Sequence, residues 1–207
     1  MKWNNVRGST PLYIPNFLNW PDQYVDWSIV DECLYRRDLH WEIIAPDGHK
    51  KEIPSLDSAW YGEYEDIRFV TQKVKRGYGF VITKFGRYNK LTNDLCREVE
   101  EEFSCVSDIH VYGGFGDASS FNPHRDDTTN AIIQVDGQTP WVVFNDDLEP
   151  ELEVTLTKGD LLYIPFQRLH QAKPSGTRLS MSIAMIPPEL KRMTIDRGPL
   201  TMYNNKE

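Results

Sequence analysis

Hydrophobic and polar residues alternate along the C-terminal half of the chain, and turn residues separate the alternating segments. Leu152, Val154 and Leu156 alternate with glutamate and threonine, which is the period-2 pattern of a strand with one buried face. Short β-rich segments of this kind, bounded by turn residues, predict eight strands, at residues 108–112, 119–126, 130–135, 140–144, 151–157, 160–165, 169–173 and 178–186. Their regular spacing predicts a jelly roll, also called a double-stranded β-helix.

The N-terminal half has a mixed pattern. Leu91, Leu95, Val99 and Phe103 are four residues apart, opposite a glutamate-rich face, and predict an amphipathic helix over residues 89–103. Similar spacing predicts a helix over about residues 20–36, and a Pro-Asp-Gly turn predicts a hairpin over residues 40–53. Strands are also expected within residues 9–18 and 79–85.

These patterns predict a mainly β protein whose N-terminal helices flank the barrel. We expect one structural unit with three parts: an α/β wrap at residues 1–105, the double-stranded β-helix at residues 106–187, and a C-terminal extension at residues 188–207.

Composition narrows the functional classes. The 207 residues are 40% hydrophobic, enough for one folded domain with a core. A net charge of −8 argues against nucleic-acid binding, which normally needs a basic surface. The three cysteines form neither a disulfide framework nor a zinc pattern, so a reducing cytoplasm is expected. Neither a signal sequence nor a stretch of about 20 apolar residues is present, so no membrane segment is predicted.

The candidate chemistry centres on the segment that contains His124 and Asp126. Residues two apart on an extended strand point to the same face, and Pro123 favours an extended conformation before it. His170, after a later strand-like segment, is the candidate third ligand. Two imidazoles and one carboxylate are the ligand set of non-haem Fe(II) oxygenases. A His-x-Asp triplet alone is also common on ordinary surfaces, so the prediction depends on all three residues.

Three further segments carry a family resemblance. A glycine-rich stretch, Val111-Tyr112-Gly113-Gly114-Phe115-Gly116, precedes the triplet, and Gly159-Asp160-Leu161-Leu162-Tyr163-Ile164-Pro165 precedes His170. Near the N-terminus stands Tyr13-Ile14-Pro15-Asn16-Phe17. With these motifs, residues 106–186 resemble the JmjC, cupin-like group of Fe(II)- and 2-oxoglutarate-dependent oxygenases.

The resemblance implies a function and a set of site residues. His124, Asp126 and His170 would be catalytic residues that bind Fe(II), with 2-oxoglutarate and O₂ as cosubstrates. Asn130 matches a polar position that faces the cosubstrate in some members, and Tyr112 is a candidate for the pocket lining. The reaction would be hydroxylation of a protein side chain, with small molecules remaining as alternative substrates.

The sequence departs from the family where the far carboxylate of 2-oxoglutarate is bound. Members usually carry lysine or arginine at the position of Thr139, and a neutral hydroxyl does not replace a charge-assisted bond. Arg178 and Ser180 resemble instead the Arg-x-Ser carboxylate clamp of the other large branch of 2-oxoglutarate oxygenases. The guanidinium of an arginine suits this role, since it can bind a carboxylate in bidentate fashion. Either Arg178 or Thr139 could therefore anchor the cosubstrate.

Two alternatives remain at this point. One is a cupin-type metal oxygenase or isomerase that does not use 2-oxoglutarate, and the other is a non-catalytic cupin-like binding module. The oligomeric state is left open by the sequence.

Overall fold

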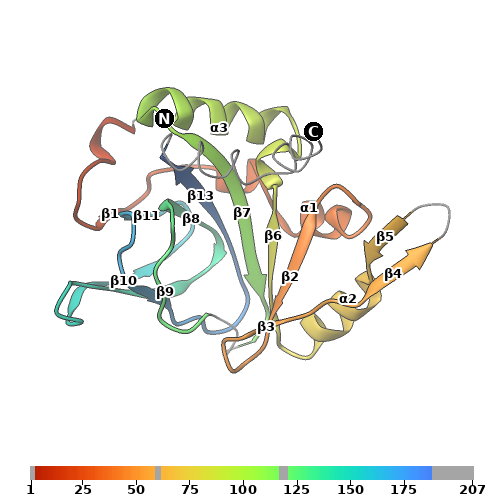
Figure 1. The fold of residues 1–207 in the computed structure, drawn as a ribbon. Helices are drawn as coiled ribbons and strands as arrows, with labels where there is room; N and C mark the ends of the chain where they lie inside the picture. Colours follow the sequence, from red (N-terminus) through yellow and green to blue (C-terminus); the bar gives the residue numbers. More distant parts are fainter. Residues whose placement is uncertain (1–2, 59–61, 117–120, 188–207) are drawn as a thin grey trace, which may run out of the picture.

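The computed structural model describes residues 3–58, 62–116 and 121–187. Its main feature is an eight-stranded sheet in the order β1-β11-β8-β13-β7-β6-β2-β3, which faces a three-stranded sheet, β10-β9-β12 (Figure 1). The barrel strands are β7 (Val106–Gly114), β8 (Thr129–Gly137), β9 (Thr139–Phe144), β10 (Pro150–Leu156), β11 (Leu161–Ile164), β12 (His170–Ala172) and β13 (Arg178–Ile186). The predicted mainly β jelly roll is confirmed.

A small apolar core joins the two sheets. Ile132 and Leu162 from the large sheet cluster with Val143 and Leu156 from the small one, and all four are buried. Strand β10 keeps the predicted alternation, since Leu156 is buried at its end and its glutamates are exposed. Burial of these aliphatic side chains holds the small sheet over the large one and leaves polar residues toward the open end of the barrel.

The N-terminal strands extend the same large sheet. Strand β6 (Gly79–Thr83) pairs antiparallel with β7, and β2 (His40–Ile44) pairs with β6 on one side and β3 (Lys50–Lys51) on the other. At the opposite edge, β1 (Leu12–Ile14) pairs with β11. Backbone hydrogen bonds therefore run across the expected boundary at residue 105, and the division there remains a prediction.

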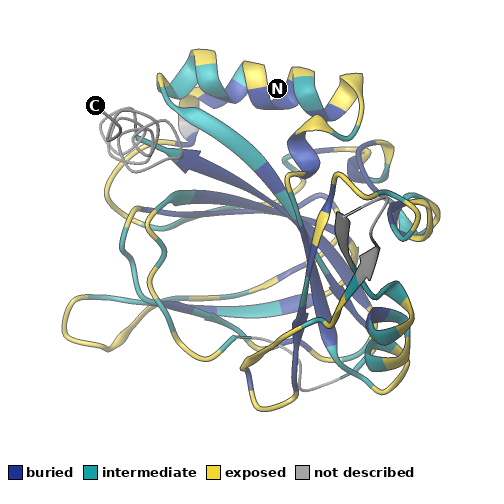
Figure 2. Cartoon of the chain, turned by 45° about the vertical axis from the view of Figure 1, so that its right-hand side comes forward, coloured by how far each residue is buried: buried dark blue, intermediate teal, exposed yellow. Residues whose placement is uncertain are grey.

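Helices cover the face of the large sheet that points away from the small one (Figure 1). Helix α3 (Lys90–Phe103) begins at Asn89 with a capping box that includes Thr92, and it buries Leu95 and Val99. Figure 2 shows buried residues along the central strands and on the side of this helix that faces them. The remaining elements are η1 (Trp3–Asn5), η2 (Pro21–Gln23), α1 (Trp27–Cys33), β4 (Ser55–Ser58), β5 (Gly62–Glu65), α2 (Ile67–Lys75) and η3 (Phe85–Arg87).

Asp160 fixes β1 to the turn before β11. Its carboxylate accepts hydrogen bonds from the Tyr13 hydroxyl (3.1 Å), the Asn16 amide (2.9 Å), and the amide and hydroxyl of Thr157 (2.8 and 2.9 Å). Burial raises the pKa of Asp160, but these hydrogen bonds outweigh that effect and hold it below the usual value. The acidic residue of the Gly-Asp motif therefore has a structural role.

Two sequence predictions need correction. The helix expected over residues 20–36 is a short 3₁₀ turn followed by α1, because Asp26 caps a new helix by accepting a hydrogen bond from the Ile29 amide. The strand expected at residues 119–126 is wrong for residues 121–126, where only an isolated bridge joins His124 to His170. Pro123 lacks an amide hydrogen and interrupts any ladder there.

Residues 117–120 of that predicted strand, and the predicted extension at residues 188–207, lie outside the described residues. Among the described helices, none is long and apolar enough to cross a membrane.

Candidate metal centre and cosubstrate pocket

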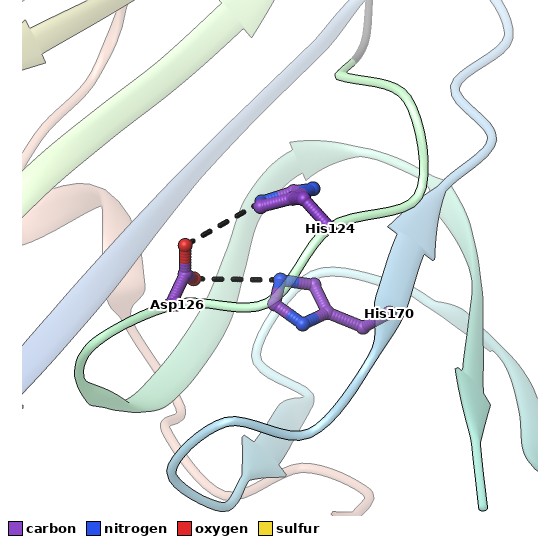
Figure 3. Close-up of side chains that lie close together, drawn as sticks. All are labelled: His124, Asp126 and His170. Carbon is purple, nitrogen blue, oxygen red and sulfur yellow. Dashed lines mark ion pairs between the residues drawn. The ribbon is translucent and has the colours of Figure 1, made fainter. Parts of the chain in front are cut away.

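The side chains of His124, Asp126 and His170 point toward one another, with Asp126 paired to both histidines (Figure 3). His124 Nε2 lies 3.5 Å from one carboxylate oxygen of Asp126, and His170 Nε2 lies 3.4 Å from the other. One ligand atom from each residue can be chosen so that all three lie within 4.8 Å of one another. Ligands at right angles around an ion, each roughly 2.1 Å from it, are about 3 Å apart. The arrangement therefore fits one divalent ion with little adjustment.

Both imidazoles are oriented by their second nitrogen. His124 Nδ1 is 2.8 Å from the carbonyl of Asn122, and His170 Nδ1 is 2.8 Å from the carbonyl of Arg168. A carbonyl only accepts, so each Nδ1 carries the proton, and each Nε2 is left with a free lone pair toward Asp126. Donation from the distal nitrogen to a carbonyl is the usual support of a metal-binding histidine.

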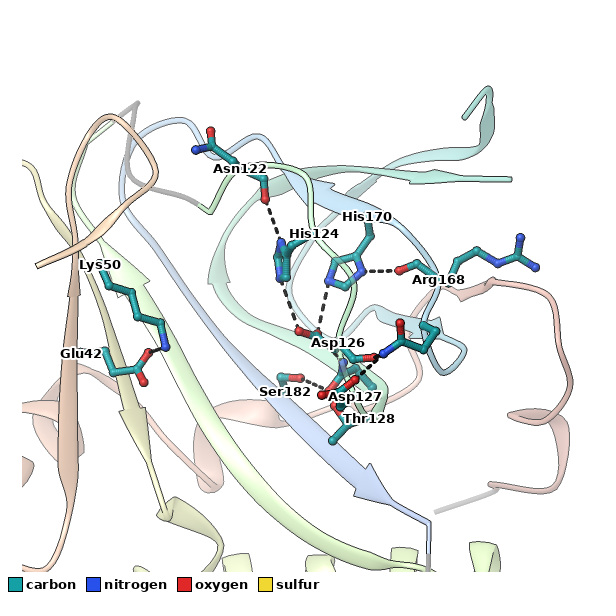
Figure 4. Close-up of polar contacts among 12 residues, drawn as sticks. Glu42, Lys50, Asn122, His124, Asp126, Asp127, Thr128, Arg168, His170 and Ser182 are labelled. Carbon is teal, nitrogen blue, oxygen red and sulfur yellow. Dashed lines mark hydrogen bonds and ion pairs between the residues drawn. The ribbon is translucent and has the colours of Figure 1, made fainter. Parts of the chain in front are cut away.

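The carboxylate of Asp126 is held by Asn130, and Figure 4 shows Asp126 with Thr128 and Ser182 beside it. Asn130 donates from Nδ2 to Asp126 Oδ2 at 2.7 Å, and its own oxygen accepts from the hydroxyls of Thr128 (3.2 Å) and Ser182 (3.4 Å). Asn130 is buried and lines the pocket, as expected. Its amide is directed at Asp126, so its role in the structure is to orient this carboxylate.

Two of the three triad groups are biased toward their metal-binding forms. Burial, followed by the nearby His170, lowers the pKa of His124, which favours the neutral imidazole. Burial raises the pKa of Asp126, but its contacts with His170, His124 and Asn130 outweigh this and lower it overall. Metal ligation requires a neutral imidazole and an ionised carboxylate, and both forms are therefore present at neutral pH.

A pocket extends from the triad into the barrel. It encloses about 700 Å³, its open mouth included, and its lining is mixed polar and apolar. All five residues predicted to bind the cosubstrate line it, namely Tyr112, Asn130, Thr139, Arg178 and Ser180. Tyr112 comes from β7, Thr139 from β9 and the pair Arg178 and Ser180 from β13. The structure brings together residues that are far apart in the sequence.

Arg178 places a buried charge in this pocket. It is 6% exposed, and its Nη1 donates to the carbonyls of Gly116 (2.9 Å) and Gly176 (3.2 Å). Its guanidinium crosses Gly114, where an added Cβ would lie only 3.0 Å from Nη1. At Gly113, on the opposite face, a Cβ would lie 2.3 Å from the Phe80 ring. The paired glycines therefore make room for the guanidinium on one face and the ring on the other.

Two buried polar atoms in the pocket have no partner within the described part of the chain. They are Thr139 Oγ1 and Trp141 Nε1, two residues apart on β9 and both in the pocket lining. Buried polar groups are nearly always hydrogen-bonded in folded proteins. A ligand with acceptor atoms, such as a carboxylate, would satisfy both groups, and the residues present therefore fit a dicarboxylate such as 2-oxoglutarate.

A second, more open groove reaches His124 and Asp126 from the side of β2 and β6. Glu42 and Lys50 stand in its wall as an ion pair at 2.7 Å, and His110 lies in its floor with a pKa lowered by burial. The hairpin that carries Lys50 touches the metal segment, since Asn122 donates to the Asp47 carbonyl at 3.3 Å. Glu42 was not identified from the sequence as a candidate site residue. The sign that could have revealed it is an acidic residue followed by Ile43 and Ile44 in a predicted strand.

Comparison with known families agrees with this geometry. The sequence profile of the JmjC domain family matches residues 143–193. This match agrees with the resemblance to the JmjC group that the sequence motifs indicate. The match covers β11, β12 and β13, and so includes His170 and Arg178.

Related sequences extend the JmjC likeness toward the N-terminus. The chain is 30% identical over 194 residues to a "Bifunctional lysine-specific demethylase and histidyl-hydroxylase NO66" of Drosophila yakuba, which covers 78% of this chain and 26% of the relative. The protein of the same name from Drosophila mojavensis is 24% identical over 195 residues, or 81% of this chain and 21% of the relative. The chain therefore spans less than a third of the length of these curated relatives.

Solved structures share the fold. The Escherichia coli ribosomal oxygenase YcfD in complex with cobalt and 2-oxoglutarate superposes with a TM-score of 0.71 at 17% identity, covering 100% of this chain and 57% of that one. The cobalt and succinic acid complex of YcfD gives a TM-score of 0.68 at 18% identity, over 91% of this chain and 52% of that one. This chain thus shares the jelly-roll fold of that oxygenase.

Proposed function

We propose that this JmjC protein is an Fe(II)- and 2-oxoglutarate-dependent oxygenase that hydroxylates a protein side chain. The observation that carries the proposal is the triad of His124, Asp126 and His170 at the mouth of a pocket with a buried arginine. The related proteins support it, since their names include a histidyl-hydroxylase and a ribosomal oxygenase with bound 2-oxoglutarate.

The metal residues have distinct tasks in this proposal. His124 and His170 bind Fe(II) through Nε2, and Asp126 binds it through a carboxylate oxygen that Asn130 keeps in place. When bound, the iron supplies the activation of O₂ that couples oxidation of 2-oxoglutarate to attack on a substrate C–H bond. The protein's own contribution is orientation of the ligands and exclusion of water.

The cosubstrate would lie between β13 and β9. Arg178 provides the positive charge for the far carboxylate, Ser180 a hydroxyl beside it, and Thr139 and Trp141 the unpaired hydrogen-bonding groups on the facing sheet. We therefore infer that both candidate anchors contribute, with Arg178 replacing the cation that Thr139 lacks. Tyr112 lines the same pocket, and burial raises the pKa of its hydroxyl, so it binds as a neutral donor.

The substrate side chain would enter through the groove along β2 and β6. That groove reaches His124 and Asp126, the two triad residues that are partly exposed, whereas His170 is buried. Its walls carry Glu42 and Lys50, so a polar or charged side chain would find partners there. The exposure of Lys50 allows it to leave Glu42 at little cost, because exposed ion pairs contribute little to stability.

We also infer an intracellular, reducing location. Cys33, Cys96 and Cys105 are free thiols, and burial raises their pKa values to about 12, 11 and 11. Unpaired, protonated cysteines are typical of proteins that are not exposed to an oxidising compartment.

An anaerobic titration of the purified chain with Fe(II) and 2-oxoglutarate tests the proposed function. We expect a visible metal-to-ligand charge-transfer band, and succinate formation once O₂ and a substrate are supplied. Asp126→Ala should lose iron and the band while keeping its circular dichroism spectrum. Iron binding without the band or succinate would favour a metal enzyme that does not use 2-oxoglutarate, and wild-type protein that binds no iron would favour a binding module.

A further inference from the structure

The loop between β11 and β12 lies against the segment that carries Asp126. Gln167 in this loop contacts three residues of that segment, Arg125, Asp126 and Asp127. Its amide donates to the Asp126 carbonyl at 3.2 Å, and its side-chain Nε2 donates to the same carbonyl at 3.1 Å. The side chain also donates to the carboxylate of Asp127, and the Gln167 carbonyl accepts from Arg125 Nη1 at 2.6 Å. One residue therefore binds three consecutive residues around a triad member.

The backbone of Gln167 is in a conformation that side chains rarely adopt. Its φ is +58°, in the left-handed region, which glycine enters easily and other residues only at a cost. Glutamine is thus present at a position where glycine would suit the backbone better. The hydrogen bonds of its side chain are the visible compensation.

The segment around Asp126 has no other regular support. Among the described residues, 125–128 belong to no strand, and the bridge between His124 and His170 precedes them. That bridge consists of two backbone hydrogen bonds of 3.1 and 3.0 Å. Asn130 fixes the end of the Asp126 side chain, and Gln167 is what fixes its backbone.

We propose that Gln167 is a positioning residue that holds Asp126 in place for metal binding. This inference rests on the proposed function, since it assigns Gln167 to the same metal site. The loop from Gln167 to His170 then sets two ligands at once, because it carries His170 itself and binds the backbone of Asp126. Residues that orient metal ligands typically change metal affinity by about 10- to 100-fold when they are removed.

The test is Gln167→Gly. This variant keeps the left-handed backbone and its amide donor but removes the side-chain amide. We expect Mn(II) affinity, measured by isothermal titration calorimetry, to fall by roughly 10-fold or more. Hydrogen exchange of the apo protein should become faster at the amide of residue 167, which donates to the Asp126 carbonyl. The unfolding temperature should stay the same or rise, because glycine relieves the backbone.

Asn145→Ala is the matched control. Asn145 also holds a loop with its side chain, accepting from the amides of Asp147 (3.0 Å) and Glu149 (2.9 Å), but it does not line the metal pocket. This variant should leave Mn(II) affinity and exchange at the amide of residue 167 unchanged.

The outcomes separate this proposal from the proposed function. Wild-type protein that binds no Mn(II) or Fe(II) would refute the metal site, and exchange in the apo protein would still decide whether Gln167 holds the segment. If wild type binds Mn(II) and Gln167→Gly binds it equally well, the positioning role is refuted, whatever the exchange rates. Unchanged exchange at the amide of residue 167 would also refute it.

Discussion

Arg178→Ala should weaken binding of 2-oxoglutarate without removing the metal site. Arg178 is buried in the pocket at the start of β13, and the triad comes from other segments. A hydrogen-bonded contact with a charged group is worth about 1.5–3 kcal/mol. Loss of that energy corresponds to a rise in Kd of roughly 10- to 150-fold. Fe(II) or Mn(II) affinity in the absence of cosubstrate should remain within about 3-fold of wild type.

A second substitution makes this prediction sharper. Thr139→Lys in the Arg178→Ala background returns a cation to the pocket. The lysine would extend from the facing sheet, at the position where Thr139 Oγ1 is unpaired in wild type. We expect it to recover part of the lost 2-oxoglutarate affinity. In wild type, the same substitution should weaken binding or stability, because it would bury a second positive charge near Arg178.

The assay is the anaerobic Fe(II) titration followed at the charge-transfer band, with 2-oxoglutarate as the varied ligand. Arg7→Ala is the control, since Arg7 also donates to a backbone carbonyl, that of Glu102 at 2.6 Å, but lies outside the pocket. Equal half-saturation for wild type and Arg178→Ala would refute the assignment of Arg178 as the carboxylate anchor. Thermal unfolding of each variant distinguishes a lost ligand contact from a lost fold.

Three further predictions concern the surrounding framework. Gly113→Ala should lower the free energy of unfolding by about 1–3 kcal/mol in urea denaturation, since its Cβ would meet the Phe80 ring. Gly114→Ala should mainly weaken 2-oxoglutarate binding in the titration, because its Cβ would displace the guanidinium of Arg178. The opposite pattern would contradict this. Asp160→Asn should cost about 1–3 kcal/mol at pH 7. Because the folded-state pKa of Asp160 is lowered, that difference should disappear as the pH falls below its ordinary value of 3.8; a difference independent of pH in urea denaturation would refute it. Burial lowers the pKa of His110 from its ordinary value of 6.5, so its contribution to stability is present above that pH and lost below it. His110→Gln should therefore lose less unfolding free energy than wild type between pH 7 and pH 5. An unaltered pH profile would exclude His110 as a source of that loss.

The sequence predicted the barrel well, and the three residues that it named as a triad lie close together in the structure. Short apolar or alternating segments bounded by turn residues located seven of the eight expected barrel strands to within a few residues. The pairing of His124 with Asp126 was predicted from strand geometry, and that reason was wrong. These residues meet in an irregular segment, held by the bridge to His170 and by Gln167. A local pattern cannot show support that comes from a loop 40 residues away.

Other features depended on tertiary contacts that no spacing reveals. Nothing in residues 79–83 indicated that this strand joins the barrel sheet beside β7. The interruption of the first helix could have been predicted, because Asp26 is a favourable capping residue at its true start. The choice between Arg178 and Thr139 as anchor was left open by the sequence, and the structure places both in one pocket.

If the proposed function holds, the hairpin formed by β2 and β3 separates recognition from catalysis along the chain. It supplies Glu42 and Lys50 to the groove, while every triad residue is encoded more than 70 positions later. Residues 40–51 of a related protein could therefore be grafted here to alter substrate choice without replacing any triad residue. The graft would have to retain Gly48, because a Cβ there would meet the Asn122 side chain at 2.9 Å. In this architecture, new specificities can arise by exchange of a short N-terminal segment.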